Sequence, residues 1–185
     1  MSEREELMRI IRELSYEERE VTLTSGRKSN FYFDGKQTTL HGHGGYLTGR
    51  LFYAEAMKFP APVEGVGGLT MGADPIATAT SLVSYLEKNP IPAFIIRKEP
   101  KKHGTGQWIE GRKNLKSGAR VVIVEDVVTT GGSSLKAVER AREEGLEVLG
   151  VVALVDREEG GREFLAEQGV ALRAIFTKTE VAGKG

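Results

Sequence analysis

The chain has 185 residues, enough to bury a core and enclose one site within a single domain. Its 26 lysine and arginine residues balance 26 aspartate and glutamate residues, so bulk charge does not favour nucleic acid or an anionic membrane, and any anion site must be local. Cysteine is absent, which excludes disulfides, thiolate nucleophiles and sulfur-ligated metals.

The first segment, residues 1–14, carries apolar side chains at helical spacing among charged ones. The apolar positions are Leu7, Ile10, Ile11 and Leu14. Their spacing predicts an amphipathic helix. The segment lacks the unbroken apolar stretch of a signal peptide, and no later segment approaches the length of a membrane span. We therefore expect a cytoplasmic protein that does not contact a membrane.

After this helix, two short β-prone stretches, residues 21–23 and 31–33, flank a polar turn that contains Ser25 and Gly26. This pattern predicts a hairpin. Beyond it, helix-like and strand-like segments alternate. We expect helices over residues 45–58, 75–87, 133–144 and 162–168, and strands near residues 63–66, 93–96, 121–124, 148–155 and 172–176.

The predicted strands are unbroken apolar runs, which are typical of strands buried on both faces. The alternation therefore predicts an α/β fold in which helices flank a central, mostly parallel sheet, and the N-terminal helix and hairpin form a small hood. We expect one domain over residues 1–185, with the hood at about 1–40, the core at 41–178 and a loose tail at 179–185. In such sheets, ligands bind beyond the carboxyl ends of the strands.

The run VVIVEDVVTTGGSS, residues 121–134, places two adjacent carboxylates, Glu125 and Asp126, where a buried strand should end. Unpaired buried carboxylates are costly, so these two need hydroxyl, cationic or metal partners, and a ribose diol supplies two donors. The small-residue loop at 129–133 leads into a helix, whose N-terminus and backbone N–H groups favour a phosphate. Alternatively, Ser133 or Ser134 merely caps that helix, but strand, acidic pair and loop together favour the phosphate site.

The same run resembles the signature with which type I phosphoribosyltransferases bind 5-phosphoribosyl 1-diphosphate (PRPP). The resemblance implies the type I fold, ribose hydroxyls held by Glu125 and Asp126, and a 5-phosphate held by residues 129–133. It also implies a catalytic part for Asp126. The PRPP-binding residues implied by the resemblance are Glu125, Asp126, Val127, Val128, Thr129, Thr130, Gly131, Gly132 and Ser133.

Basic side chains cluster directly after the strand expected at 93–96. They are Arg97, Lys98, Lys101, Lys102 and His103, and glycines at 104, 106 and 111 permit the backbone excursions of a moving lid. Charge runs are usually solvated, but a lid at the same sheet edge as the phosphate loop would stabilise departing pyrophosphate.

RKEPKKHGTG resembles the catalytic loop of orotate phosphoribosyltransferases. The resemblance implies catalytic contacts to pyrophosphate for Arg97, Lys98, Lys101 and His103. It also implies a homodimer in which the lid reaches the neighbouring subunit's site. Trp108 either packs on the closed lid or anchors the loop locally, and the sequence leaves both open.

The segment LTSGRKSNFYF resembles the part of that family that lies near orotate, and Tyr32 and Phe33 are the aromatic residues we expect to contact the base. The guanidinium of Arg157, in LVDREEGG, can bind a carboxylate through two hydrogen bonds, and a carboxylate is the group that distinguishes orotate from uracil. The alternative is a surface ion pair with a neighbouring acid at 156, 158 or 159, but the family's Asp-Arg motif favours the ligand role. Thr129 is also expected at orotate.

GGLTMGADPIA, residues 67–77, resembles the family's pyrophosphate loop, which implies contacts from Thr70, Met71 and Gly72. The chain departs from the best-known bacterial pattern at two positions, where Met71 and Thr24 replace lysines. Neither side chain can replace a cation, so we expect backbone amides to bind the substrate there instead.

Together these resemblances imply an orotate phosphoribosyltransferase, a pentosyltransferase of pyrimidine (UMP) biosynthesis that joins orotate to PRPP and releases pyrophosphate and orotidine 5'-monophosphate. Mg²⁺ is the expected cofactor, bridging substrate oxygens, and we assign it no direct protein ligand. PRPP and orotate are the expected partners, without nucleic acid. Two alternatives stay open: transfer to a purine or uracil, and a non-catalytic PRPP-binding regulator of the same fold.

Overall fold

The structure is a computed structural model that describes residues 1–22, 28–100 and 107–183. A hood comes first in the chain. Helix α1 (Glu3–Leu14) begins with a capping box between Ser2 and Glu5. Strands β1 (Tyr16–Thr22) and β2 (Lys28–Phe33) then pair in antiparallel fashion, which confirms the predicted hairpin. A short helix, α2 (Gly35–Thr39), connects the hood to the core.

The core is a six-stranded sheet in the order β5-β4-β3-β6-β7-β8. Its parallel strands are β3 (Gly65–Leu69), β4 (Ala93–Ile96), β6 (Arg120–Val128), β7 (Glu147–Asp156) and β8 (Leu172–Thr177). The two-residue strand β5 (Ile109–Glu110) pairs with β4 in the opposite direction, and a 3-10 turn at Arg112–Asn114 follows it. The mostly parallel sheet of the predicted α/β fold is thereby confirmed.

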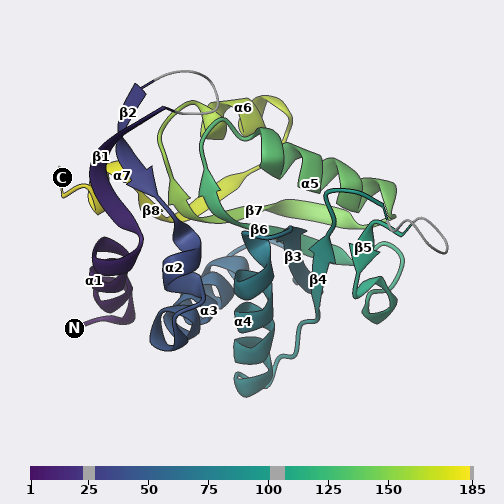
Figure 1. Cartoon of the computed structure of the whole chain (residues 1–185). Helices are drawn as coiled ribbons and strands as arrows, with labels where there is room; N and C mark the ends of the chain where they lie inside the picture. The colour runs from purple at the N-terminus through teal and green to yellow at the C-terminus, as the bar shows by residue number, and fades with distance from the viewer. Residues whose placement is uncertain (23–27, 101–106, 184–185) are drawn as a thin grey trace.

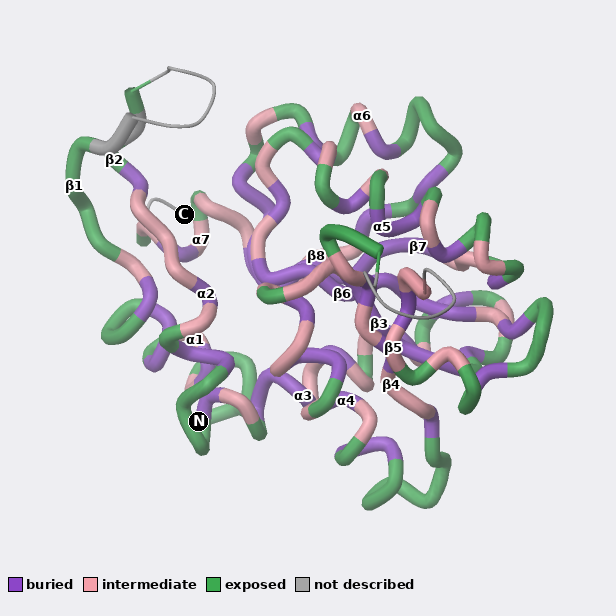
Figure 2. The backbone as a smooth tube through the Cα atoms, turned by 45° about the vertical axis from the view of Figure 1, so that its right-hand side comes forward, coloured by how far each residue is buried: buried purple, intermediate pink, exposed green. Residues whose placement is uncertain are grey.

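Helices cover both faces of the sheet, as Figure 1 shows. Helices α3 (Gly42–Ala56) and α4 (Ala73–Leu86) lie on one face, and α5 (Gly132–Glu143) and α6 (Gly161–Glu167) on the other. Side chains of β6 alternate between the two cores, because successive residues of a strand point to opposite faces. Val122 and Val124 pack on the α3 and α4 side, whereas Val121 and Ile123 pack on the α5 side. This double burial explains the unbroken apolar strands, which are buried along most of their length in Figure 2.

The structure differs from the sequence predictions mainly in short elements and in element ends. Helix α2 and strand β5 were not predicted, because five and two residues are too short to show a periodic pattern. Strand β6 runs to Val128, four residues past its predicted end at 124, since pairing with β7 continues to Asp156.

Residues 178–181, where the sequence predicted mostly loose tail, form helix α7 (Lys178–Val181). Thr177 and Glu180 form a capping box at its start, and Arg12 of α1 donates to the carbonyl oxygens of Glu180 and Val181 at 2.6 and 3.0 Å. Over the described ranges, no helix has the length and apolar character needed to cross a membrane.

Candidate active site

The acidic pair lies inside β6 rather than beyond its end, which corrects the sequence prediction. Glu125 is 6% exposed and Asp126 is 9% exposed, because the strand continues through both residues to Val128. Glu125 Oε2 accepts a hydrogen bond from Ser133 Oγ at 3.3 Å, in the first turn of α5. Asp126 Oδ1 accepts one from the backbone N–H of Val127 at 2.9 Å. The pair is thus partnered by groups of its own strand and of helix α5.

Burial raises the pKa of Glu125 to about 8, and repulsion from the Asp126 carboxylate adds to this rise. Burial and mutual repulsion therefore favour a shared proton within this pair. A pair in this state offers both a donor and acceptors, which suits contact with hydroxyl groups.

Two glycines allow other elements to approach Asp126 closely. A Cβ added to Gly35, at the start of α2, would lie 2.9 Å from Asp126 Cβ. One added to Gly72, just before α4, would lie 2.5 Å from Asp126 Oδ1. Both distances are shorter than side chains tolerate. The hood, the loop at 70–72 and strand β6 therefore converge on one carboxylate.

The loop at 129–133 has the geometry of an anion site at a helix N-terminus. Gly131 has a φ of +82° and is the N-cap of α5, where it supplies no side-chain cap. The alternative in which Ser133 or Ser134 caps the helix is therefore wrong. The N–H groups of the first turn keep their capacity for an anion, and the helix dipole favours one there. Val128 is buried in the core, so its side chain faces away from this loop's solvent side.

The loop at 70–72 follows β3 and leads into α4. Thr70 Oγ1 donates to Asp74 Oδ2 at 2.8 Å, and the peptide bond between Thr70 and Met71 is cis. Met71 is 64% exposed. The contact of Gly72 with Asp126 brings this loop beside the acidic pair, as the sequence predicted for residues after neighbouring parallel strands.

The first two residues of the cationic loop follow β4. Arg97 Nη1 contacts Glu110 Oε1 at 3.1 Å, and Lys98 is exposed. Both line a pocket of about 570 Å³ that also includes Ser133, so they lie on the phosphate-loop side of the sheet edge. Lys101, Lys102 and His103 lie outside the described residues, as does Thr24.

Trp108 is anchored locally. The guanidinium carbon of Arg140, on α5, lies 3.7 Å from the centroid of its ring, and the indole packs on the apolar core beneath that helix. Of the two interpretations that the sequence left open, this contact supports the anchor.

Arg157 lies at the end of β7, directly beside the end of β6, because its backbone N–H donates to the Val128 carbonyl at 2.9 Å. Its guanidinium is buried and contacts Glu159 Oε1 at 3.1 Å and the Phe31 carbonyl at 3.3 Å. Glu159 also accepts from Lys178 Nζ at 3.2 Å. The pairing with Glu159 was the predicted alternative, but it is buried rather than on the surface, and the separate contact with the Phe31 carbonyl joins Arg157 to the hood.

The aromatic residues of β2 occupy different environments. Phe31 is buried and stacks near Phe33, with ring centroids 6.1 Å apart. A Cβ added to Gly35, the residue that packs on Asp126, would lie 3.2 Å from Cε1 of Phe33, so the Phe33 ring lies beside Gly35. The guanidinium carbon of Arg19 lies over the ring of Tyr32, 3.9 Å from its centroid.

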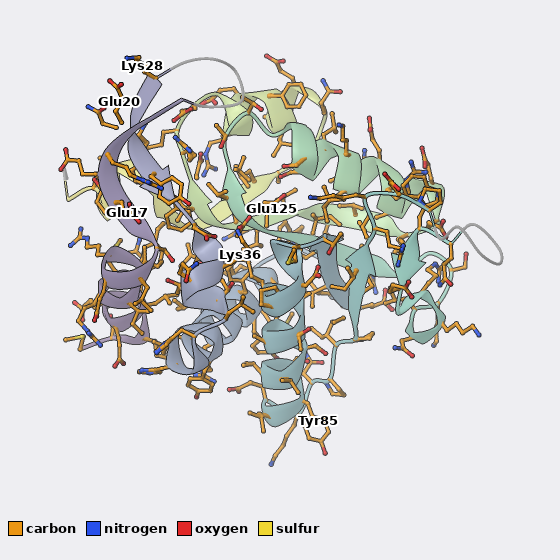
Figure 3. The ribbon with its side chains drawn as sticks, viewed as in Figure 1. Glu17, Glu20, Lys28, Lys36, Tyr85 and Glu125 are labelled. Carbon is orange, nitrogen blue, oxygen red and sulfur yellow. The ribbon has the colours of Figure 1, made fainter. Side chains whose placement is uncertain are left out.

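Lys36 was missed by sequence reasoning. It lies in the first turn of α2, and its Nζ is 2.6 Å from Asp34 Oδ1. The hydrogen bond to Asp34 raises the pKa of Lys36 above its ordinary value, and the charge of Asp126 adds to the rise. Figure 3 shows Lys36 below Glu125 where the hood meets the sheet. The available signal was the Asp34-Gly35 pair, which typically ends a strand and caps a helix.

Comparison with known proteins gives one consistent family. Residues 67–167 match the family described as phosphoribosyl transferase domain. The orotate phosphoribosyltransferase of Nostoc sp. is 49% identical over 174 residues, which cover 94% of this chain and 82% of that protein. The enzyme of the same name from Aquifex aeolicus is 48% identical over 184 residues, 98% of each chain.

Solved structures agree with the sequence relatives. The crystal structure of Mycobacterium tuberculosis orotate phosphoribosyltransferase in complex with PRPP has a TM-score of 0.80 and 37% identity, covering 98% of this chain and 99% of that chain. The adenine phosphoribosyltransferase of Trypanosoma brucei, with a TM-score of 0.68 and 11% identity, shares the fold alone. The fold by itself therefore does not select the base.

Proposed function

The chain belongs to the orotate phosphoribosyltransferase family, and we propose that its acidic pair, phosphate loop and hood together transfer the 5-phosphoribosyl group of PRPP to N1 of orotate. The products are orotidine 5'-monophosphate and pyrophosphate, a step of pyrimidine nucleotide synthesis. The observation that carries the proposal is the buried pair Glu125 and Asp126 on β6, followed directly by an uncapped glycine turn at the start of α5.

The PRPP half of the reaction uses β6 and α5. The ribose hydroxyls donate to and accept from Glu125 and Asp126, which retain a proton near neutral pH. The 5-phosphate binds at the first turn of α5, where residues 129–133 supply N–H and hydroxyl donors. These two contacts hold the anomeric carbon over the carboxyl edge of the sheet.

During transfer, the bond between the anomeric carbon and the pyrophosphate oxygen breaks, and its electron pair leaves with pyrophosphate. A new bond forms from N1 of orotate, whose proton is lost to solvent. Arg97 and Lys98 are the proposed contacts for departing pyrophosphate, a role supported by the pocket that they share with Ser133. Lys101 and His103, outside the described residues, remain predicted members of the same lid, and we assign no general base.

Mg²⁺ is proposed as the cofactor. Carboxylate oxygens such as those of Glu125 and Asp126 are the ligands that this ion prefers, either directly or through water. Within the described part of the chain, no three His, Asp or Glu side chains gather as an all-protein site. An ion held largely by substrate oxygens and water fits this pair, and it would neutralise charge on the pyrophosphate.

Arg157 is the proposed contact for the acidic edge of the base. It is buried, and the Phe31 carbonyl and Glu159 fix its direction. A guanidinium that is already oriented binds a carboxylate bidentately with little further loss of freedom. Of the two predicted aromatic contacts we favour Phe33, because its ring lies beside Gly35, which packs on Asp126.

The proposed base preference is tested by offering PRPP and Mg²⁺ together with orotate, uracil, adenine, hypoxanthine or xanthine, and following pyrophosphate release. We expect release with orotate alone, and loss of about tenfold or more in kcat/KM for orotate in Arg157→Ala. Release with a purine would reject the orotate assignment. No release with any base, together with retention on a DNA or RNA column at physiological salt, would favour a regulator.

A homodimer is the proposed assembly. An apolar groove runs between α2 and α4 from the edge of the site, and its lining residues are Lys36, Leu40, Met71, Asp74, Pro75, Thr78, Ala79 and Leu82. Leu40, Met71 and Leu82 are each more than 60% exposed, and Tyr85 continues the apolar surface at the far end of α4 (Figure 3). Exposed apolar surface of this kind favours a protein partner. A second copy is consistent with a lid shared between sites, and a cytoplasmic location stays a prediction.

A further inference from the structure

Lys36 is a cation at the junction of hood and core. None of the substrate contacts proposed above uses its ammonium. Its side chain is 39% exposed, and its ammonium binds Asp34 Oδ1 at 2.6 Å. Isolated ion pairs with this exposure contribute little to stability. The pair therefore does not by itself explain why a lysine stands beside the acidic pair.

The position of Lys36 is fixed from two sides. Asp34 caps α2, because its Oδ1 accepts from the Lys36 backbone N–H at 3.2 Å, while its Oδ2 accepts from Gln37 Nε2 at 3.2 Å. Gly35 packs on Asp126 with no room for a side chain. Lys36, which follows Gly35, is thus held next to Asp126. The carboxylate of Asp34 orients both α2 and the Lys36 ammonium.

The Lys36 side chain shares a groove with the loop at 70–72. Lys36 lines the same groove as Met71 and Asp74, and Gly72 completes the loop beside Asp126. Met71 and Gly72 bring no charge, whereas Asp74 lines the groove and the Asp34 and Asp126 carboxylates act on Lys36 itself. An anionic substrate group bound beside this loop would be repelled by the carboxylates of Asp74 and Asp126 unless a cation offset their charges.

We propose that Lys36 is a substrate-binding residue whose ammonium contacts an anionic oxygen of the PRPP pyrophosphate on the side of the loop at 70–72, with Asp34 holding it there. The inference rests on the proposed function, because it concerns a substrate of that same reaction. It assigns to α2 the positive charge that Met71 does not supply.

The test compares Lys36→Met with Lys58→Met. Lys58 forms a similar short-range ion pair, with Glu55 at the end of α3, away from the site. Titration calorimetry would measure binding of PRPP with Mg²⁺, of pyrophosphate with Mg²⁺ and of orotidine 5'-monophosphate. Lys36→Met should weaken PRPP and pyrophosphate binding about tenfold or more, the usual effect of losing one charged hydrogen bond. Binding of orotidine 5'-monophosphate, which lacks pyrophosphate, should change less than about twofold.

Lys36→Arg should restore part of the lost affinity, because it keeps a cation at this position, and Lys58→Met should behave as the unaltered protein. Unchanged pyrophosphate affinity in Lys36→Met would overturn the inference. An equal loss for all three ligands would also overturn it, since that result indicates a structural role. Failure of the unaltered protein to use orotate would reject the proposed function alone, because pyrophosphate binding still reports on Lys36.

Discussion

Glu125 shows how one residue can link the stability of the fold to its chemistry. A carboxyl group buried inside a strand is stable only when neutral or well paired, and here burial raises its pKa to about 8. Its neutral form therefore stabilises the fold fully below the ordinary value of 4.5, and this contribution is lost as the pH rises through 8. Ionisation of this buried carboxyl group costs stability, and we attribute its presence in the strand to its function at the site.

Glu125→Gln should separate this effect from the rest of the protein's titration, because glutamine has nearly the same shape and no ionisable proton. The variant and the unaltered protein should unfold with similar free energies at pH 5. At pH 9 the variant should be more stable, by a few kcal/mol at most. Urea unfolding at both pH values measures the difference in free energy of unfolding between the two proteins. The contributions of the other titrating groups cancel in this difference. Parallel pH profiles would show that Glu125 titrates normally.

At the scale of elements, the site depends on how closely the loop before α4 approaches β6. Gly72 has a φ of −60°, which any residue adopts, so its glycine is required by space rather than by backbone conformation. A Cβ there would lie 2.5 Å from Asp126 Oδ1, and the carboxylate would have to move.

Gly72→Ala should therefore displace Asp126 and lower kcat/KM for PRPP about a hundredfold, since misplacement of a catalytic group by about 1 Å has effects of this size. We expect a loss of about 1–3 kcal/mol in the free energy of unfolding from overpacking. Gly42→Ala is the matched control, because no atom lies within 4 Å of a Cβ at that position. Steady-state kinetics and urea unfolding measure both quantities, and wild-type kinetics in Gly72→Ala would exclude the close approach.

The elements that sequence could predict are those with long, regular apolar patterns. Residues such as Val121 and Val124 mark a doubly buried strand without ambiguity, and α4 and α5 follow from helical spacing. Helix α2 could not be predicted in this way, because it is too short for a periodic pattern. It is stabilised by the Asp34 cap and by the close packing of Gly35 on Asp126.

The candidate site was predictable where a motif is contiguous, as with Glu125 and Asp126. It was not predictable where partners come from distant segments. The contact of Arg157 with the Phe31 carbonyl joins residues 126 positions apart, and only the closed fold brings them together. The contribution of Lys36 was hidden for the same reason, since Asp126 and Met71 are its neighbours in space and not in sequence.

At the scale of the whole molecule, the groove between α2 and α4 connects the proposed active site to the proposed dimer surface. Met71 belongs to both, because it lies in the loop beside Asp126 and lines the groove. If a partner subunit covers this groove and the lid is shared as the family resemblance implies, dimer formation and catalysis should depend on each other. Leu82→Glu places a charge in the lining of the groove, and Leu14→Glu, on the exposed end of α1, is its control.

Light scattering should show that Leu82→Glu halves the mass in solution and that Leu14→Glu does not. A mixture of the impaired Lys101→Ala and Arg157→Ala proteins, dissociated and reassociated, then tests whether the lid is shared. If the lid serves the neighbouring site, one of the two sites in each mixed dimer contains neither substitution, so random pairing should restore about a quarter of the activity. A lid that serves its own subunit leaves every site with a substitution, and the mixture would stay impaired.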